Sequence, residues 1–379
     1  MKIMYISHRF ETNICATMHL KALREYYGED QVFVVDLRTE EEPEKTENKI
    51  VFGAMTNFEK ILRTIEGNSW YLNNARINKI CSLIKSELIT TVFIDESIFG
   101  NLVATIKKRT PQVKVITFYH DIAQDLYVYW RKTKGKKFAI EMRAGIKGEK
   151  KNQKFSDVNL VLNNRDKEQF IKYFNREPEG LLPVAVAMPD LLMTSADEFD
   201  FSTISKDKKM ILFVGSLYQP NIDGLKWYVE NVFSELDDKY CLIVIGRGLE
   251  KLRSEYSSYE NIIIIGKVKE LAPYYNNADV VIAPLFDGGG MKQKTAEAFA
   301  YGKPFIGTME SLQGYEQAVE MKFNGKKVVF SCESAKEQIL ALDTIEQQGL
   351  YGMYPELTAY FETNYSVNAI KRELTKWIV

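Results

Sequence analysis

Short apolar runs alternate with longer amphipathic segments over the whole chain. The apolar runs are rich in Val, Ile and Phe, as buried strands are. The segments between them, such as LKWYVENVFSEL and RDKEQFIKYF, space their apolar residues with a helical period. Strands that alternate with helices predict an α/β fold with parallel sheets. The predicted strands are Lys2–Ser7, Gln31–Val35, Thr91–Ile94, Lys114–Phe118, Val158–Leu162, Met210–Val214, Tyr240–Ile245, Asn261–Ile265, Val280–Ala283 and Pro304–Gly307.

Residues 184–209 interrupt this alternation, because they are polar and lack periodicity apart from a short apolar patch. We predict that they link two domains, residues 1–183 and 210–350. The length of 379 residues also favours two domains over one large core. Residues 351–379 are predicted to be helical and end with KRELTKWIV.

The segment from Ala283 to Thr308, APLFDGGGMKQKTAEAFAYGKPFIGT, contains a strand end, a glycine turn and a short helix that stops at Gly302. The N-terminus of this helix offers free backbone N–H groups and the positive end of the helix dipole, which favour a phosphate. Open α/β sheets bind ligands at the carboxyl ends of their strands, where this turn is predicted to lie. Three consecutive residues form the turn: Gly288, Gly289 and Gly290.

The predicted helix carries a cation and a carboxylate on one face. Lys294, Glu297 and Tyr301 are spaced by three and four residues, so they share that face. A lysine near the phosphate end and a carboxylate one turn further on suit a nucleotide diphosphate, because the carboxylate can accept hydrogen bonds from ribose hydroxyls. We expect Lys294, with Lys292 as a second candidate, to contact phosphate and Glu297 to bind ribose from an exposed helix face. Solvated surface charges are the alternative for all three.

This segment resembles the donor-binding segment of GT-B glycosyltransferases, in particular the retaining family 4 type. In that family a glycine-rich loop and helix hold the nucleotide sugar, and a Glu just before Ala, here Glu297, binds the ribose. MILFVGSLYQPNIDGLKWYVENVF resembles the opening strand, loop and helix of the donor domain, and YCLIVIGRG resembles its next strand and turn. NIIIIGKVKELAPYYNNADVVIAPLF resembles the segment that passes the base and reaches the sugar.

The resemblance implies a GT-B fold, with two Rossmann-like domains facing across a cleft. It also implies that the last helix, within residues 351–379, crosses back onto the N-terminal domain. The implied reaction is transfer of a sugar from a nucleotide sugar to an acceptor hydroxyl, with retention.

The chain departs from the family pattern after its first C-terminal strand. In the family an Arg commonly follows the glycine that ends this strand, a Lys lies a few residues on, and both contact the diphosphate. Here Gly215 is followed by Ser216, and Asn221 lies near the position of the Lys. We expect Arg247, in the IGRG turn, or the lysines of the glycine-rich segment to supply the missing cations.

A second departure concerns the residue that touches the donor sugar. Many family members carry a Glu eight residues before the ribose Glu, but here that position is Gly289 and the nearest carboxylate is Asp287. The resemblance implies that Asp287, or the backbone amides of Gly289 and Gly290, contacts the sugar in its place.

Two further positions follow predicted strands. His120 comes directly after a strand, where the family often has a His that faces the donor sugar across the cleft. A structural histidine is the alternative. Val268, in the loop after IIIIG, would read the base through backbone groups, and a plain connection is the alternative. His8 ends the first strand and would line the acceptor side.

Composition narrows the class of protein. The formal net charge of −1 gives no global field for nucleic acid, and the longest apolar runs are too short to span a membrane. The N-terminal apolar stretch is too short for a signal peptide, so we expect a cytoplasmic protein. Widely separated cysteines indicate neither a disulfide framework nor a zinc site; they are Cys15, Cys81, Cys241 and Cys332. No DxD motif or metal-ligand spacing is visible, so we expect metal independence.

Residues 127–154 combine aromatic and basic side chains. Tyr127, Tyr129 and Trp130 precede a segment, Arg131–Lys154, with ten Lys or Arg against two Glu. Such a stretch suits peripheral contact with an anionic membrane, on its inner face for a cytoplasmic protein, or an acceptor that carries phosphate. A solvated pair of surface helices is the alternative.

The expected protein is a glycosyltransferase of the hexosyltransferase class, as in polysaccharide biosynthesis. Its donor would be a UDP-sugar bound as substrate with no separate cofactor, and its acceptor a glycan, a lipid-linked molecule or a protein. A nucleotide-sugar 2-epimerase on the same fold is one alternative. A non-catalytic GT-B-like partner subunit is another, and the missing Arg, Lys and first Glu favour it.

Overall fold

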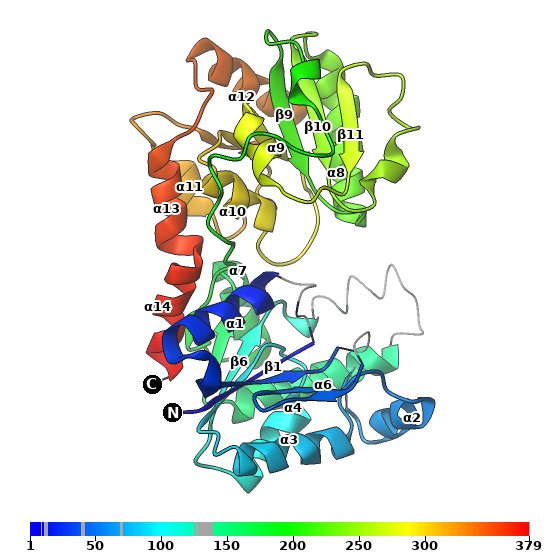
Figure 1. The fold of residues 1–379 in the computed structure, drawn as a ribbon, viewed down its shortest axis with the longest axis vertical. Coiled ribbons are helices and arrows are strands. Elements are labelled where there is room, and N and C mark those ends of the chain that lie inside the picture. Colours follow the sequence, from blue (N-terminus) through cyan, green and yellow to red (C-terminus); the bar gives the residue numbers. More distant parts are fainter. Residues whose placement is uncertain are drawn as a thin grey trace. The chain divides into compact units, whose positions relative to one another are not determined.

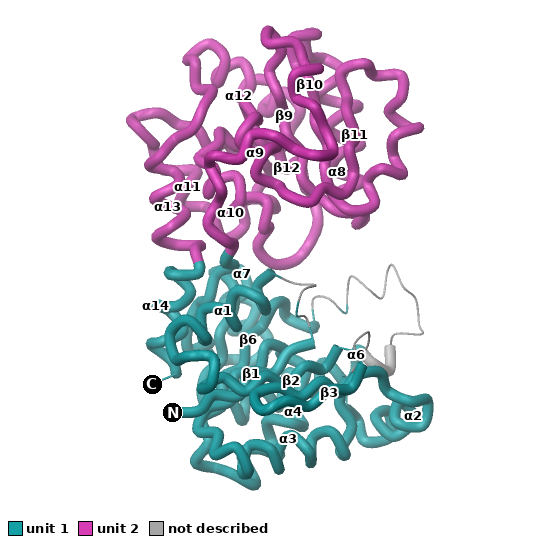
Figure 2. The backbone as a smooth tube through the Cα atoms, viewed as in Figure 1, with its two compact units in different colours: residues 1–185, 367–379 teal, residues 186–366 magenta. Residues whose placement is uncertain are grey.

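The computed structural model describes residues 1–8, 10, 14–38, 42–68, 71–124, 127 and 139–378, with the backbone alone for 139–141. The chain forms two compact units, Met1–Ala185 with Val367–Val379 and Val186–Ser366 (Figures 1 and 2). Each unit is built around its own sheet of mostly parallel strands.

The sheet of the first unit has the strand order β3-β4-β2-β1-β5-β6-β7-β8, and only the β3–β4 pair is antiparallel. Because β2 and β5 lie on opposite sides of β1, the winding of the chain reverses at β1, and a crevice is expected at the carboxyl ends of β1 and β5. The strands are β1 (Ile3–Ser7), β2 (Val32–Asp36), β3 (Glu44–Lys45), β4 (Lys49–Val51), β5 (Thr91–Ile94), β6 (Lys114–Tyr119), β7 (Val158–Val161) and β8 (Gly180–Leu181).

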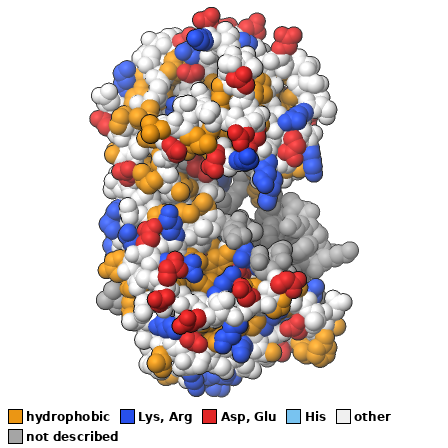
Figure 3. All heavy atoms as spheres, viewed as in Figure 1, with side chains coloured by type: hydrophobic (Ala, Val, Ile, Leu, Met, Phe, Trp, Pro, Cys, Tyr) orange, Lys and Arg blue, Asp and Glu red, His pale blue; other side chains and the backbone are white. Residues whose placement is uncertain are grey.

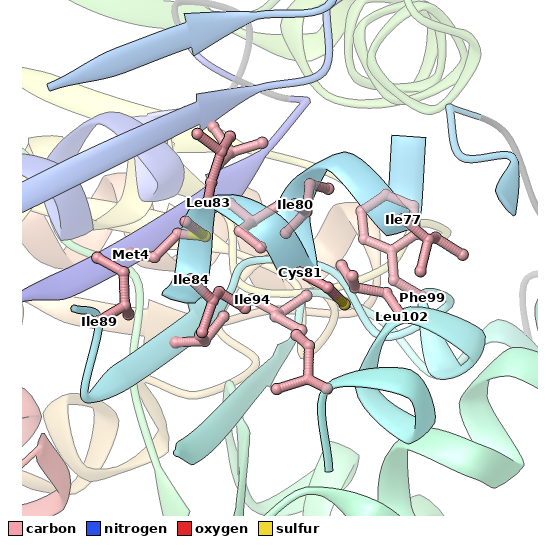
Figure 4. Packing of buried hydrophobic residues seen from close by; sticks show 14 of the residues in the cluster. Met4, Ile77, Ile80, Cys81, Leu83, Ile84, Ile89, Ile94, Phe99 and Leu102 are labelled. Atoms are coloured by element: carbon pink, nitrogen blue, oxygen red, sulfur yellow. The ribbon is translucent and has the colours of Figure 1, made fainter. Parts of the chain in front are cut away.

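Helices cover this sheet with apolar side chains. In α3, Ile77, Ile80 and Ile84 recur with helical spacing and pack in one buried cluster with Met4 from β1 and Leu102 from α4 (Figure 4). Helix α14 packs against α1, so the end of the chain belongs to the first unit. The described α-helices of this unit are α1 (Ile14–Tyr27), α2 (Asn57–Ile65), α3 (Asn74–Ser86), α4 (Gly100–Arg109), α6 (Ala139–Phe155), α7 (Asn164–Phe174) and α14 (Val367–Ile378).

The sheet of the second unit is wholly parallel, with the order β11-β10-β9-β12-β13-β14. Its winding reverses between β9 and β12. The strands are β9 (Lys209–Val214), β10 (Tyr240–Ile245), β11 (Ile262–Gly266), β12 (Val280–Ala283), β13 (Phe305–Gly307) and β14 (Val329–Ser331). The helices are α8 (Gln219–Asn231), α9 (Ala272–Asn277), α10 (Gln293–Ala300), α11 (Glu316–Glu320), α12 (Ala335–Gln347) and α13 (Pro355–Tyr365).

All ten predicted strands are present, each within one residue of its predicted bounds. The sequence pattern missed β3, β4, β8 and β14, which have two or three residues and are too short to show a period. The segment after Ala185 belongs to the second unit, where Val186 forms a bridge to Ser366. Among the described residues, no helix combines the length and the apolar character needed to span a membrane.

Candidate functional site

The loops after β9, β10 and β12 lie at the carboxyl edge of the second sheet, around the point where its winding reverses. Glycines let these loops approach closely. A Cβ on Gly246 would lie 1.3 Å from the carbonyl oxygen of Gly215, and a Cβ on Gly224 would lie 2.3 Å from that of Pro284. The N–H of Leu217 also donates to the carbonyl of Arg247 at 2.9 Å. The predicted residues Gly215, Ser216 and Arg247 therefore come from adjoining loops.

The glycine-rich turn connects β12 to α10 and is closed by Lys292. Gly288 and Gly290 have φ values of 135° and 61°, which L-residues with a side chain rarely adopt. The Lys292 ammonium donates to the carbonyls of Gly289 and Gly290 at 3.0 and 3.2 Å and pairs with Glu310 at 2.6 Å. An ammonium has three donors, and all three are used. Lys292 therefore holds the turn in shape, and its predicted contact with a phosphate stays a prediction.

Lys294 lies in the first turn of α10 and is buried. Its Nζ donates to Oδ1 of Asn221 at 2.8 Å and lies 4.6 Å from the centre of the Phe213 ring. Asn221 in turn donates to the carbonyl of Ser216 at 3.0 Å. Burial lowers the pKa of Lys294 to about 7, although Glu297 opposes this shift. The resembling family has a Lys near the position of Asn221. Here helix α10 supplies an ammonium at the loop after β9 instead, that of Lys294.

Glu297 lies one turn beyond Lys294 and is half-buried rather than exposed as the sequence suggested. The hydroxyl of Tyr275 donates to its Oε2 at 2.8 Å, and the Tyr301 ring stacks on Tyr275 with centroids 4.7 Å apart. Burial raises the pKa of Glu297, while Tyr275 and Lys294 lower it. The second carboxylate oxygen makes no hydrogen bond within the described residues and can accept one from a ligand.

The remaining predicted residues of this unit are more open to solvent. Asp287 is exposed, and its Oδ1 accepts a hydrogen bond from the N–H of Gly288 at 2.7 Å. Ser216 and Arg247 are exposed, and Val268 is half-buried in the loop after β11. Sequence reasoning missed Tyr275, because only the packing of α9 beside α10 brings its hydroxyl to Glu297.

His120 belongs to the first unit, where it follows β6 and is buried. Its Nε2 lies 3.2 Å from Oδ2 of Asp95, and Nδ1 of His19 lies 3.2 Å from Oδ1 of the same carboxylate. Ser7 donates to Oδ2 of Asp95 at 3.1 Å. Burial alone would raise the pKa of Asp95, but the two histidines hold it well below its usual range. Asp95 therefore positions His120. The sequence signal for Asp95 is its place directly after β5.

Glu149, on α6, is a second buried carboxyl near this sheet edge that sequence reasoning missed. Its Oε1 accepts hydrogen bonds from the N–H of Ala123 at 2.8 Å and from the hydroxyl of Ser97 at 3.0 Å. Burial, with a smaller contribution from the nearby carboxylates Glu96 and Asp121, raises its pKa to about 8, although the hydrogen bonds from Ala123 and Ser97 lower it. Glu149 thus joins the loop that follows His120 to the loop that follows β5.

Part of the predicted aromatic and basic stretch, residues 128–138, lies outside the described residues. The described part is Tyr127 and helix α6. Within the described residues, no group of three or more His, Cys, Asp or Glu could hold a metal ion, and metal independence stays a prediction.

The chain is similar to known glycosyltransferases in part of its sequence and in its fold. Residues 208–344, little more than a third of the chain, match the family model of Glycosyl transferases group 1. The structure matches the Anabaena protein HepE in complex with UDP and glucose with a TM-score of 0.69 and 12% identity, over 99% of this chain and 98% of that one. The fold is GT-B. No curated protein matches the sequence significantly.

Two further solved structures match over nearly their full lengths. The lipopolysaccharide outer core galactosyltransferase WaaB matches with a TM-score of 0.66 and 14% identity, over 100% of this chain and 99% of that one. A glycosyltransferase from Rickettsia africae matches with a TM-score of 0.66 and 12% identity, over 99% and 97%. At these identities the structures show the fold. The fold and the family match together support the GT-B glycosyltransferase superfamily.

Proposed function

We propose that this protein transfers a sugar from a nucleotide-diphosphate sugar to an acceptor hydroxyl. The observation that carries the proposal is the pair Lys294 and Glu297, a buried cation and a half-buried carboxylate one turn apart beside the glycine turn. The match of residues 208–344 to a glycosyltransferase family supports the same reaction class. A hexose is the sugar class we propose.

The donor site follows from this geometry. The diphosphate would lie between the backbone amides of the turn Gly288–Gly290, the amide of Gly215 or Ser216, and the ammonium of Lys294. One Lys294 donor is used by Asn221, so others remain for an anion. The free oxygen of Glu297 would accept hydrogen bonds from the ribose. We propose a UDP-sugar as donor, and a solved HepE structure contains UDP-glucose.

The chemistry that these groups supply is electrostatic. Negative charge grows on the diphosphate as the bond to the sugar breaks, and donors already fixed near it stabilise that charge without reorganising. We propose that Lys294 and the loop amides do this without a metal ion, that Arg247 adds a cation from the surface, and that the sugar is transferred with retention. His120 and Asp287 are proposed to contact the sugar.

A donor screen by mass spectrometry tests the function, with nucleotide release measured in the presence and absence of candidate acceptors. The expected result is a glycosylated acceptor together with free nucleotide, and turnover that persists in excess EDTA. Release of free nucleotide and an epimerised sugar without an acceptor would indicate a nucleotide-sugar 2-epimerase. Failure of calorimetry to detect binding of any nucleoside diphosphate would indicate a non-catalytic subunit.

A further inference from the structure

Helix α2 exposes three of its four apolar side chains, and the fourth, Leu62, is half-buried. Phe58, Ile61 and Ile65 lie on one helical face and are 68%, 59% and 76% exposed. A surface helix of a globular protein normally buries its apolar face, so the exposure of these three side chains is unusual. Figure 3 shows apolar side chains at the lower right of the view, where α2 lies in Figure 1.

Polar contacts hold α2 in this orientation. Thr56 and Glu59 form a capping box at its N-terminus, and Glu59 also lies 3.7 Å from Nε of Arg76. Just beyond its C-terminus, Glu66 accepts a hydrogen bond from the N–H of Asn74 at 2.7 Å. Glu59 and Glu66 therefore tie α2 to α3, while Phe58, Ile61 and Ile65 stay exposed.

Helix α6, which packs against α2, carries a basic face. Five cations on it are exposed, and their positions fall within one narrow arc of the helix. None of the five forms an ion pair within the described residues, and the one acidic side chain described on this helix, Glu149, is buried on the opposite face. The cations are Arg143, Lys147, Lys150, Lys151 and Lys154.

We propose that α2 and the basic face of α6 dock together on an anionic lipid surface. Apolar side chains of an interfacial helix enter the boundary between headgroups and acyl chains, and neighbouring cations are attracted to anionic headgroups. The formal net charge of the chain is −1, so the five exposed cations of α6 are a local feature and not part of a basic protein. Charge complementarity thus favours a lipid surface over a second copy of this chain.

Sedimentation of the full chain with vesicles tests the proposal. Vesicles of phosphatidylcholine alone are compared with vesicles that also contain phosphatidylglycerol, at low and high salt. The expected result is binding to the anionic vesicles, weakened by salt. The double variant Ile61→Ser/Ile65→Ser and the double variant Lys147→Glu/Lys150→Glu should each lower the partition coefficient at least tenfold. Unchanged melting temperatures would show that these variants are folded, as expected for exposed positions.

Helix α12 offers a matched control. Lys336 and Leu340 are exposed on it and one turn apart, so Lys336→Glu/Leu340→Ser changes the same residue types on the other unit and should leave vesicle binding intact. Equal and negligible binding of the wild type to both vesicles would overturn the proposal. So would an equal loss in the α12 variant, or a dimer in solution that Ile61→Ser/Ile65→Ser dissociates.

Discussion

Lys294 and Glu297 share one helix face, but each is held by a partner from a different element. Asn221 comes from α8 and Tyr275 from α9, so the geometry of the pair depends on three helices. Both groups are withdrawn from bulk water, which makes their charge states sensitive to a bound anion. This sensitivity can be measured without knowledge of the acceptor.

Glu297→Ala should weaken binding of UDP by about ten- to a hundredfold, because a hydrogen bond to a charged group contributes roughly 1.5–3 kcal/mol. Calorimetry on the two proteins measures this. Tyr275→Phe is the control, since it removes the partner of Glu297 and keeps the carboxylate. Equal affinity of wild type and Glu297→Ala would remove Glu297 from the site.

Binding of UDP should take up a proton at Lys294. The pKa of its ammonium is about 7 without ligand, and a diphosphate beside it would raise that value. Affinity should therefore fall by up to about tenfold per pH unit above pH 7. Calorimetry in buffers of different ionisation enthalpy measures the uptake. Lys294→Met should abolish it, whereas Lys336→Met on α12 should not. Identical uptake in wild type and Lys294→Met would contradict this assignment.

Glu149 should make stability depend on pH. Its pKa is about 8 in the fold against 4.5 as the ordinary value, so its contribution is full below pH 4.5 and is lost as pH rises towards 8. At about 1.4 kcal/mol per pH unit, this loss amounts to a few kcal/mol. Glu149→Gln keeps an acceptor for Ala123 and Ser97 but cannot ionise, so its melting temperature should fall less than that of the wild type between pH 5 and 8.5. Parallel curves would show that Glu149 does not titrate there.

At the scale of the elements, the loops after β9 and β10 together form one wall of the candidate site. They can do so because their backbones pack directly against each other. Gly246 lacks the side chain that would collide with Gly215, and its φ of 139° suits glycine. The turn between β12 and α10 is set in a different way, by the ammonium of Lys292 and its pair with Glu310. One wall of the site is thus shaped by backbone sterics and another by side-chain hydrogen bonds.

Gly246→Ala should destabilise the second unit and weaken UDP binding. Gly325 offers a matched control, because its φ is 73° but a Cβ there would meet nothing within 4 Å. Gly325→Ala should cost only the backbone strain, about 1–2 kcal/mol, whereas Gly246→Ala adds the collision with Gly215. Urea unfolding of the two variants measures the difference. Equal loss of stability would mean that the loop after β9 moves away freely.

At the scale of the whole molecule, the chain builds two Rossmann-like units and returns to the first one with its last helix. Helix α13 stays with the second unit and α14 packs on α1 of the first, so the change occurs near Ser366 and Val367. Each sheet reverses its winding at its first strand, β1 and β9, and the polar clusters described above lie beside those strands. In both units the polar cluster therefore lies at the carboxyl edge of the sheet, near the strand at which the winding reverses.

The sequence by itself determined the strands, the glycine turn and the helix that follows, because these depend on residues close together in the chain. Only the tertiary structure decided how the side chains are used. Lys294 meets Asn221 across 73 positions and Lys292 meets Glu310 across 18, so no local pattern could show that one ammonium contacts Asn221 and the other closes the turn. Burial likewise raises the pKa of Glu149, which in the sequence resembles any solvated glutamate of a basic helix. The physical reason is that the order of the strands determines which distant residues meet and which lose water.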